Sequence, residues 1–200
     1  MAAATATATA GKSLEARIIE CMRGRVPGLS IAVVRPDGIR WIQGFGLADL
    51  STQTPAAPDT VYLWFSMTKI ATATAVLQLM ERRLVSLDDP VVRHYPPFAT
   101  LRPSSSAEQV TIRHLLSHSS GLANPIPVKW VRLAGEPAPE SGVFLRALLA
   151  RYAHLKFPPD TKASYSNLGF LVLGEVIKSV SGQPYEEYVR RSILTPLGMK

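Results

Sequence analysis

The chain has 200 residues, of which 46% are hydrophobic and 18% are charged. This composition suffices for one domain with a sizeable core and excludes an intrinsically disordered chain; it also excludes a membrane-spanning helix, because no apolar run approaches the roughly 18 residues that a span needs. The net charge of +7 would suit nucleic acid, but the basic residues form isolated pairs and no basic run alternates with aromatic residues, so we predict no nucleic-acid partner.

The N-terminus, residues 1–12, is a low-complexity stretch of alanine and threonine that we interpret as a disordered leader. A secretory signal would begin with basic residues before a Leu/Val-rich core, whereas the first charge here is Lys12. Cys21 is the only cysteine, so no intrachain disulfide can form. We therefore predict a cytoplasmic location, although a single cysteine leaves export open.

The first expected elements are a helix over 13–23 and two antiparallel strands. The strands are the apolar, β-branched runs 29–34 and 39–45, and the Asp-Gly pair between them is typical of a hairpin. Residues 51–60, rich in proline and threonine, are expected to be a connector. The helix has one apolar face, formed by Leu14, Ile18, Ile19 and Met22.

The rest of the chain is expected to be mostly helical. A long loop is expected at 123–140, beside a cleft, and irregular proline-containing segments at 87–98 and 157–167. A hairpin alone is marginal in water, so either helices cover a small sheet or further strands belong to a continuation that this chain lacks. The expected helices run from after Phe65 to about Arg83, from Thr111 to Gly121, and over 141–152, 168–180 and 185–194.

Ser66 and Lys69 stand where the helix after Phe65 begins and form a Ser-x-x-Lys motif. On a helix this spacing places both side chains on one face, so the amine can hydrogen-bond the hydroxyl and help to remove its proton. The helix N-terminus adds N–H groups that stabilise negative charge on an attacked carbonyl. The alternative is an N-terminal serine followed by a solvated lysine, and the four residues alone leave both interpretations open.

Tyr165 and Asn167, in the segment Tyr-Ser-Asn, form the second candidate group. A tyrosine near lysines, here Lys162 in sequence, can have a lowered pKa and act as a general base. The asparagine side chain can bind a substrate amide or carbonyl. The structural alternative is that Asn167 caps the helix starting at Leu168 while the aromatic ring packs behind it. Both interpretations can hold at once.

His114 and His118 are spaced like a metal-binding pair. No glutamate follows the first histidine as in H-E-x-x-H, and no third ligand is evident, so we predict no metal and interpret the pair as packed or capping histidines. A Ser-His-Asp hydrolase is not expected either. The sequence has no G-x-S-x-G motif, and Ser119 and Ser120 stand where a helix stops.

Four segments in order resemble the serine β-lactamase and penicillin-binding-protein-like superfamily, above all its class C β-lactamase-like branch and related esterases. They are FSMTKIATATAVLQLMERRLVSLDDPV, VTIRHLLSHSSGL, FPPDTKASYSNLGFLVLGEVI and SGQPYEEYV…ILTPLGM, and the likeness covers 26–199. The resemblance implies an α+β, β-lactamase/transpeptidase-like fold over 13–200. It would comprise a helical domain, mostly within 60–200, and a partial α/β domain with an antiparallel sheet beginning in 13–50, its C-terminal strands missing.

The resemblance also implies a role for each candidate residue. Ser66 would be the acylated nucleophile, and its backbone N–H would form half of the oxyanion hole. Lys69 would share the proton network, and Tyr165 would be the general base or proton relay. Asn167 would bind both the substrate and this network. No metal or organic cofactor is implied.

The sequence departs from the family pattern in two places. The family has a third motif on a strand near its C-terminus, a Lys or His followed by Thr-Gly, and nothing after Tyr165 matches it. Asp160 stands where the family usually has glycine, and aspartate can adopt a positive φ at a cost. His118 and Gly121, in contrast, match a family segment that we take as structural.

The predicted function is that of a serine hydrolase that forms an acyl-enzyme on carboxylic esters, β-lactams or D-amino-acid amides. The predicted cytoplasmic location favours an esterase-like activity. The alternative is a catalytically incomplete fragment, or a non-enzymatic binding or scaffold module. The expected partner is a small-molecule ester or lactam substrate, and a hairpin without its full sheet could recruit a second copy of the chain into a homo-oligomer.

Overall fold

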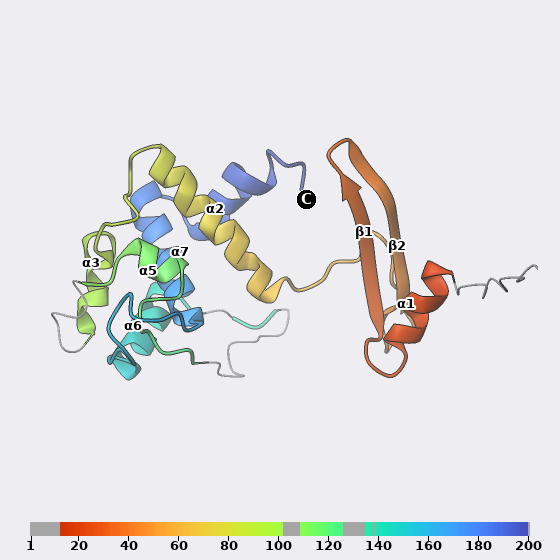
Figure 1. Cartoon of the computed structure of the whole chain (residues 1–200), viewed down its shortest axis with the longest axis horizontal. Helices are drawn as coiled ribbons and strands as arrows, with labels where there is room; N and C mark the ends of the chain where they lie inside the picture. The colour runs from red at the N-terminus through yellow and green to blue at the C-terminus, as the bar shows by residue number, and fades with distance from the viewer. Residues whose placement is uncertain (1–12, 102–108, 126–134, 138, 200) are drawn as a thin grey trace, which may run out of the picture. The chain divides into compact units, whose positions relative to one another are not determined.

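The computed structural model describes residues 13–101, 109–125, 135–137 and 139–199 (Figure 1). The chain divides into two compact units, Met1–Leu63 and Trp64–Lys200. The predicted leader at 1–12 and much of the predicted loop at 123–140 lie outside the described residues. In the described part of the chain, no helix is both long and apolar enough to cross a membrane.

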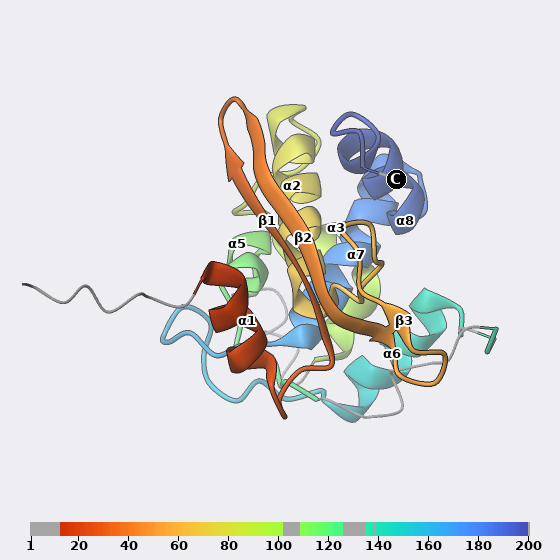
Figure 2. The same ribbon diagram turned by 90° about the vertical axis from the view of Figure 1, so that its right-hand side faces the viewer.

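The first unit begins with the expected helix and hairpin. Helix α1 (Leu14–Met22) starts at Ser13, whose hydroxyl accepts a hydrogen bond from a first-turn backbone N–H and so caps the helix. Strands β1 (Gly28–Arg35) and β2 (Gly38–Asp49) pair antiparallel around a two-residue turn. Figure 2 shows this long ribbon with α1 beside it. The hairpin predicted from the apolar runs is therefore confirmed.

The connector expected at 51–60 contains a short third strand. Strand β3 (Thr54–Pro55) pairs antiparallel with the end of β2, which completes a sheet of order β1-β2-β3. Two residues are too few to give an alternating pattern, so the sequence did not predict this strand. Gly46 in β2 has a φ of +70°, and a Cβ there would lie 2.2 Å from the Pro27 carbonyl oxygen, so only glycine fits.

The second unit is built from helices. They are η1 (Phe65–Met67, a 3₁₀ turn), α2 (Thr68–Glu81), α3 (Val91–His94), η2 (Pro96–Thr100, also 3₁₀), α5 (Ile112–Leu116), α6 (Ser141–Arg151), α7 (Asn167–Ser181), α8 (Tyr185–Val189) and η4 (Arg190–Leu194, a π-helical turn). The helix expected to continue to Gly121 ends earlier, because His118 adopts a φ of +59°. The proline-containing segment at 87–98 holds two short helical turns that its broken pattern did not predict.

Helix α7 organises the core of the second unit and packs against α2, α5, α6 and α8 (blue in Figure 1). It begins at Ser166, whose side chain caps it, and ends at Gly182 in the left-handed conformation. Burial of each large apolar side chain contributes roughly 1.5–3 kcal/mol, so this face holds the helix firmly in place. The side chains of α7 that are fully buried are Leu168, Val172, Leu173, Val176 and Ile177.

Candidate active site

Ser66 lies in the 3₁₀ turn η1, and Lys69 lies in the first turn of α2 that follows. Lys69 Nζ donates a hydrogen bond to Ser66 Oγ at 3.3 Å. The preceding Phe65 has a φ of +43°, which is rare for a bulky residue and is a kind of strain found at functional sites. The lysine therefore has a defined partner, as the Ser-x-x-Lys interpretation requires, and it is not a solvated surface charge.

Tyr165 reaches the same hydroxyl from a segment 99 residues further along the chain. Its phenolic O–H donates to Ser66 Oγ at 2.7 Å, and its ring lies 4.8 Å from Lys69 Nζ. Burial raises the pKa of Tyr165, but hydrogen bonds with Lys69 and Ser66 and the lysine charge outweigh it and hold this pKa below its ordinary value. A lowered pKa favours the phenolate that a general base must supply.

Asn167 is directed at Lys69 and does not cap the helix. Its Oδ1 accepts from Lys69 Nζ at 2.8 Å. The cap of α7 is the neighbouring Ser166, whose Oγ accepts from the Gly169 N–H at 3.1 Å. The structural alternative for Asn167, a capping residue, is therefore wrong. The serine performs that role one position earlier, which leaves the asparagine side chain free to face the lysine.

Asn124 is a member of the site that sequence reasoning missed. Its Oδ1 accepts from both the backbone N–H and the side-chain Nδ2 of Asn167, each at 3.0 Å. The amide nitrogen of Asn167 is thus turned toward Asn124, and its oxygen toward Lys69. The two asparagines are 43 residues apart, and no motif surrounds Asn124, so only the tertiary structure reveals the pair.

His118 packs behind the tyrosine. Its ring centroid lies 4.5 Å from that of Tyr165 and 5.1 Å from that of Phe170, and its Nδ1 accepts from the Ser166 N–H at 3.2 Å. Burial, followed by the charge of Lys69, lowers the pKa of His118. A neutral imidazole with its proton on Nε2 fits these contacts, because Nδ1 must accept.

Backbone hydrogen bonds fix the segment that leads to Tyr165. The Ser164 N–H donates to the His118 carbonyl at 2.8 Å, and the Asp160 N–H donates to the Ser119 carbonyl at 2.9 Å. Asp160 has a φ of +64°, as expected for an aspartate in a glycine position. Gly121 has a φ of +79°, and a Cβ there would lie 2.1 Å from a backbone oxygen. The geometry thus agrees with a structural role for the 118–121 segment.

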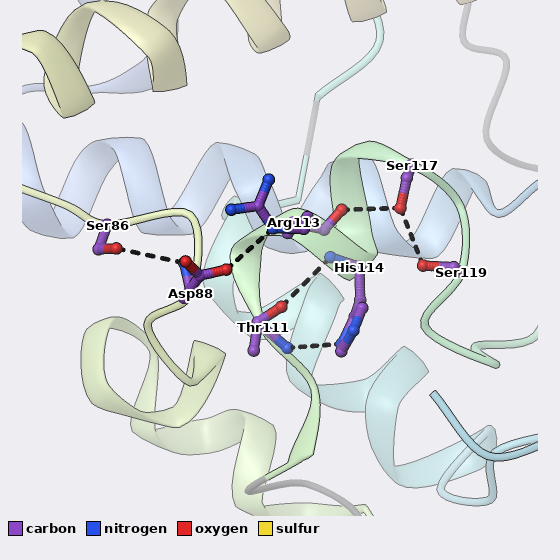
Figure 3. Close-up of polar contacts among 7 residues, drawn as sticks. All are labelled: Ser86, Asp88, Thr111, Arg113, His114, Ser117 and Ser119. Atoms are coloured by element: carbon purple, nitrogen blue, oxygen red, sulfur yellow. Dashed lines mark hydrogen bonds and ion pairs between the residues drawn. The ribbon is translucent and has the colours of Figure 1, made fainter. Parts of the chain in front are cut away.

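His114 is occupied elsewhere, as a helix cap. The Thr111 N–H donates to His114 Nδ1 at 3.2 Å, and Thr111 Oγ1 accepts from the His114 N–H at 3.4 Å, which forms a capping box at the start of α5. Figure 3 shows this pair beside the Arg113–Asp88 ion pair. Within the ranges that the structure describes, no group of three or more His, Cys, Asp or Glu side chains could hold a metal ion.

A sequence model of the Beta-lactamase family matches residues 14–200. Esterase EstB of Burkholderia gladioli is 34% identical over 183 residues, which cover 88% of this chain and 46% of the esterase. The chain spans about a third to a half of the length of the curated relatives that it matches.

Two solved structures show the same partial coverage. The octameric penicillin-binding protein homologue from Pyrococcus abyssi has a TM-score of 0.74 and 30% identity, and covers 93% of this chain and 42% of its own. The D-amino acid amidase from Ochrobactrum anthropi SV3 has a TM-score of 0.74 and 29% identity, and the match covers 90% of this chain and 47% of the amidase.

Proposed function

The chain belongs to the Beta-lactamase family, and on that premise we propose that it carries a serine hydrolase site in which Ser66 is acylated. The predicted α+β fold of the β-lactamase/transpeptidase type is confirmed, and the chain covers part of that fold. One observation carries the proposal: Ser66 Oγ accepts hydrogen bonds from both Tyr165 and Lys69. Relatives named as an esterase and an amidase support a small ester or amide substrate.

In the proposed reaction, Tyr165 first loses its phenolic proton to solvent. Ser66 Oγ then attacks the substrate carbonyl carbon and its proton passes to the phenolate oxygen of Tyr165. The Lys69 ammonium stabilises that phenolate before the transfer. Backbone N–H groups at the start of the helix stabilise the oxyanion of the tetrahedral intermediate. The leaving alcohol or amine then takes the proton from Tyr165 as its bond to the carbonyl carbon breaks. Water attacks the acyl-enzyme in the same way and releases the acid, which restores Ser66.

Asn167 has a double role in this proposal. Its Oδ1 holds the Lys69 amine in place, at 2.8 Å, while Asn124 fixes the orientation of its amide group. The same side chain lines the adjoining cavity, where it can meet a substrate. We propose esters as the preferred substrates over β-lactams and D-amino-acid amides. We further propose that residues 13–200 form a single β-lactamase-like domain. We also propose that the protein is cytoplasmic and that it forms a homo-oligomer.

The test is the intact mass of the 200-residue chain after exposure to a fluorophosphonate and, separately, to a labelled penicillin. We expect one adduct per chain with the fluorophosphonate. Ser66→Ala should abolish it, and Tyr165→Phe should slow its formation by roughly 10²–10⁴-fold, the usual contribution of general base catalysis. Ser192→Ala, at a serine in η4, is the matched control and should label like the unchanged chain.

Two outcomes would contradict the proposal. One is an adduct that persists in Ser66→Ala, which would place the nucleophile elsewhere. The other is no adduct at all on chain that circular dichroism shows to be folded, which would favour a catalytically incomplete fragment or a binding module. A penicillin adduct in preference to the fluorophosphonate adduct would reverse the proposed order of substrates.

A further inference from the structure

A groove of about 500 Å³ runs along one face of α7 and begins beside the proposed site. The α7 residues that line the groove recur every three or four positions, so they share one face of the helix over three turns. From Asn167 to Lys178, eleven residues at a rise of 1.5 Å give a length of roughly 16 Å. The α7 residues that line it are Asn167, Phe170, Leu171, Gly174, Glu175 and Lys178.

The two ends of the groove differ from its middle. At the near end stand Lys69 and Asn167, and Lys69 Nζ is 3.3 Å from the proposed nucleophile, Ser66 Oγ. The apolar side chains of the lining are Phe65, Phe170, Leu171 and Pro184. Thr72 and Tyr185 also line the groove, and their hydroxyls are satisfied by a hydrogen bond to each other at 2.8 Å. Along α7 the lining therefore changes from the polar Asn167 to the apolar Phe170 and Leu171 with distance from the reacting hydroxyl.

The far end is charged. Glu175 accepts a hydrogen bond from Ser141 Oγ at 2.6 Å, and Lys178 lies 3.8 Å from the same carboxylate. Glu186 also lines the groove. Pushing methylene groups against ionised side chains would strip their water, at a cost in free energy that apolar contact does not recover. A bound apolar chain would therefore gain stability along the middle of the groove and lose it at this end.

We propose that this groove binds the acyl chain of the substrate and makes medium-length linear acyl esters the preferred class. The inference rests on the proposed acylation of Ser66, because it assigns the groove to the acyl group that this residue would carry. Each methylene placed on the apolar wall should improve binding by up to roughly fourfold. A chain long enough to reach Glu175 and Lys178 should lose that gain.

Gly174 allows the groove to be blocked at mid-length. It lines the groove without a side chain, and a Cβ built there would lie 3.8 Å from Tyr185 Cδ2, which is ordinary contact. Gly174→Leu should therefore fill the groove without displacing the helix, and leucine is a better helix former than glycine. Gly174→Ala is the graded comparison, because it adds a single methyl group and should obstruct the groove less than leucine does.

The first experiment measures binding without chemistry. In the Ser66→Ala chain, calorimetric titration should show that octanoate binds at least tenfold more tightly than butyrate, with its carboxylate near Lys69. Adding Gly174→Leu should reduce octanoate affinity at least tenfold and change butyrate affinity little, whereas Gly174→Ala should reduce octanoate affinity by a smaller factor. Equal affinity for the two acids, or an octanoate affinity indifferent to Gly174→Leu on a folded chain, would overturn the groove assignment.

The second experiment measures turnover of nitrophenyl esters by the chain with Ser66 intact. kcat/KM should rise from acetate through butyrate to octanoate and fall for palmitate, and Gly174→Leu should move the maximum to a shorter ester. A maximum at acetate would overturn the inference. If octanoate binds as expected in the first experiment but no ester is hydrolysed, the groove assignment to a medium-length chain stands and the proposed function fails, so the two failures are distinguishable.

Discussion

The two units of the chain rely on different interactions. In Trp64–Lys200, helices from distant parts of the sequence bury a shared apolar core around α7. In Met1–Leu63, the main interaction is the backbone ladder of β1 and β2, and among the described residues of that unit the buried apolar side chains are Met22, Phe45 and Ala56.

This difference explains where a polar site can be built. Ser66 and Tyr165 are 99 residues apart, and their hydroxyls meet because α2 and α7 are both fixed by buried side chains. A rigid core can hold several polar groups in one orientation. A hairpin is instead constrained at the few positions where its backbone needs an unusual conformation. Substitutions should therefore act on side-chain volume in one unit and on backbone conformation in the other.

The largest effect is expected in the core of the helical unit. Leu173 of α7 is fully buried, so Leu173→Ala should lower the free energy of unfolding by about 2–5 kcal/mol through lost burial and the cavity left behind. Leu197→Ala is the matched control, because Leu197 is 69% exposed and its change should stay within about 0.5 kcal/mol. Urea denaturation measures both, and equal losses would contradict the idea of a volume-sensitive core.

The hairpin unit should respond to backbone conformation. Gly46 and Gly24 have nearly the same φ, +70° and +67°, but a Cβ on Gly46 would meet the Pro27 oxygen, whereas one on Gly24 would meet nothing within 4 Å. Gly24→Ala should cost about 1 kcal/mol of conformational strain, and Gly46→Ala should cost about 1–3 kcal/mol more. Hydrogen exchange of the β1 and β2 amides measures both. Equal losses of stability in the two variants would mean that backbone strain alone, and not the close approach of the Pro27 oxygen, determines the cost of replacing Gly46.

Asn124 tests how far the helical unit controls its site. Asn124→Leu leaves two Asn167 N–H groups without their acceptor, so the Asn167 amide can turn away from Lys69. We expect the rate of Ser66 acylation to fall by roughly tenfold, equivalent to about 1.4 kcal/mol. Asn124→Asp keeps an acceptor in place and should recover most of the rate. Fluorophosphonate labelling rates measured across pH separate this from a loss of folding, which would reduce the rate equally at every pH.

Periodic patterns predicted the secondary structure well and the site only in part. The longer helices of the second unit and the hairpin of the first were expected from apolar spacing, which is a local property. Ser66 and Lys69 were recognisable because their contact follows from helical spacing alone. The contact of Lys69 with Asn167 joins residues 98 apart, so the sequence could suggest each residue but not their distance.

The features that the sequence did not predict also depend on tertiary contacts or are too short to give a pattern. Ser166 and Asn167 are both good capping residues, and only the position of α7 decides that Ser166 performs this role. Asn124 contacts Asn167, which lies 43 residues further along the chain. Strand β3 and the turns α3 and η2 are too short to produce a period. Local sequence patterns thus predicted the helices and strands, whereas tertiary contacts determine which side chain caps a helix and which one faces the site.

The smallest expected effect is a dependence of stability on pH from the helical unit. Burial holds the pKa of His118 below its ordinary value of 6.5, so the unfolded chain takes up a proton at a higher pH than the folded chain does. The contribution of neutral His118 to the free energy of unfolding is therefore complete above about pH 6.5. It is lost as the pH falls from there through the pKa of His118 in the folded chain. Protonation would also set a donor against the Ser166 N–H and a second positive charge beside Lys69. Urea midpoints should thus be lower at pH 5.5 than at pH 7.5, and the difference should shrink in His118→Asn, whose amide can accept the same N–H and tolerate the positive φ. An unchanged difference in that variant would assign the pH dependence to other groups.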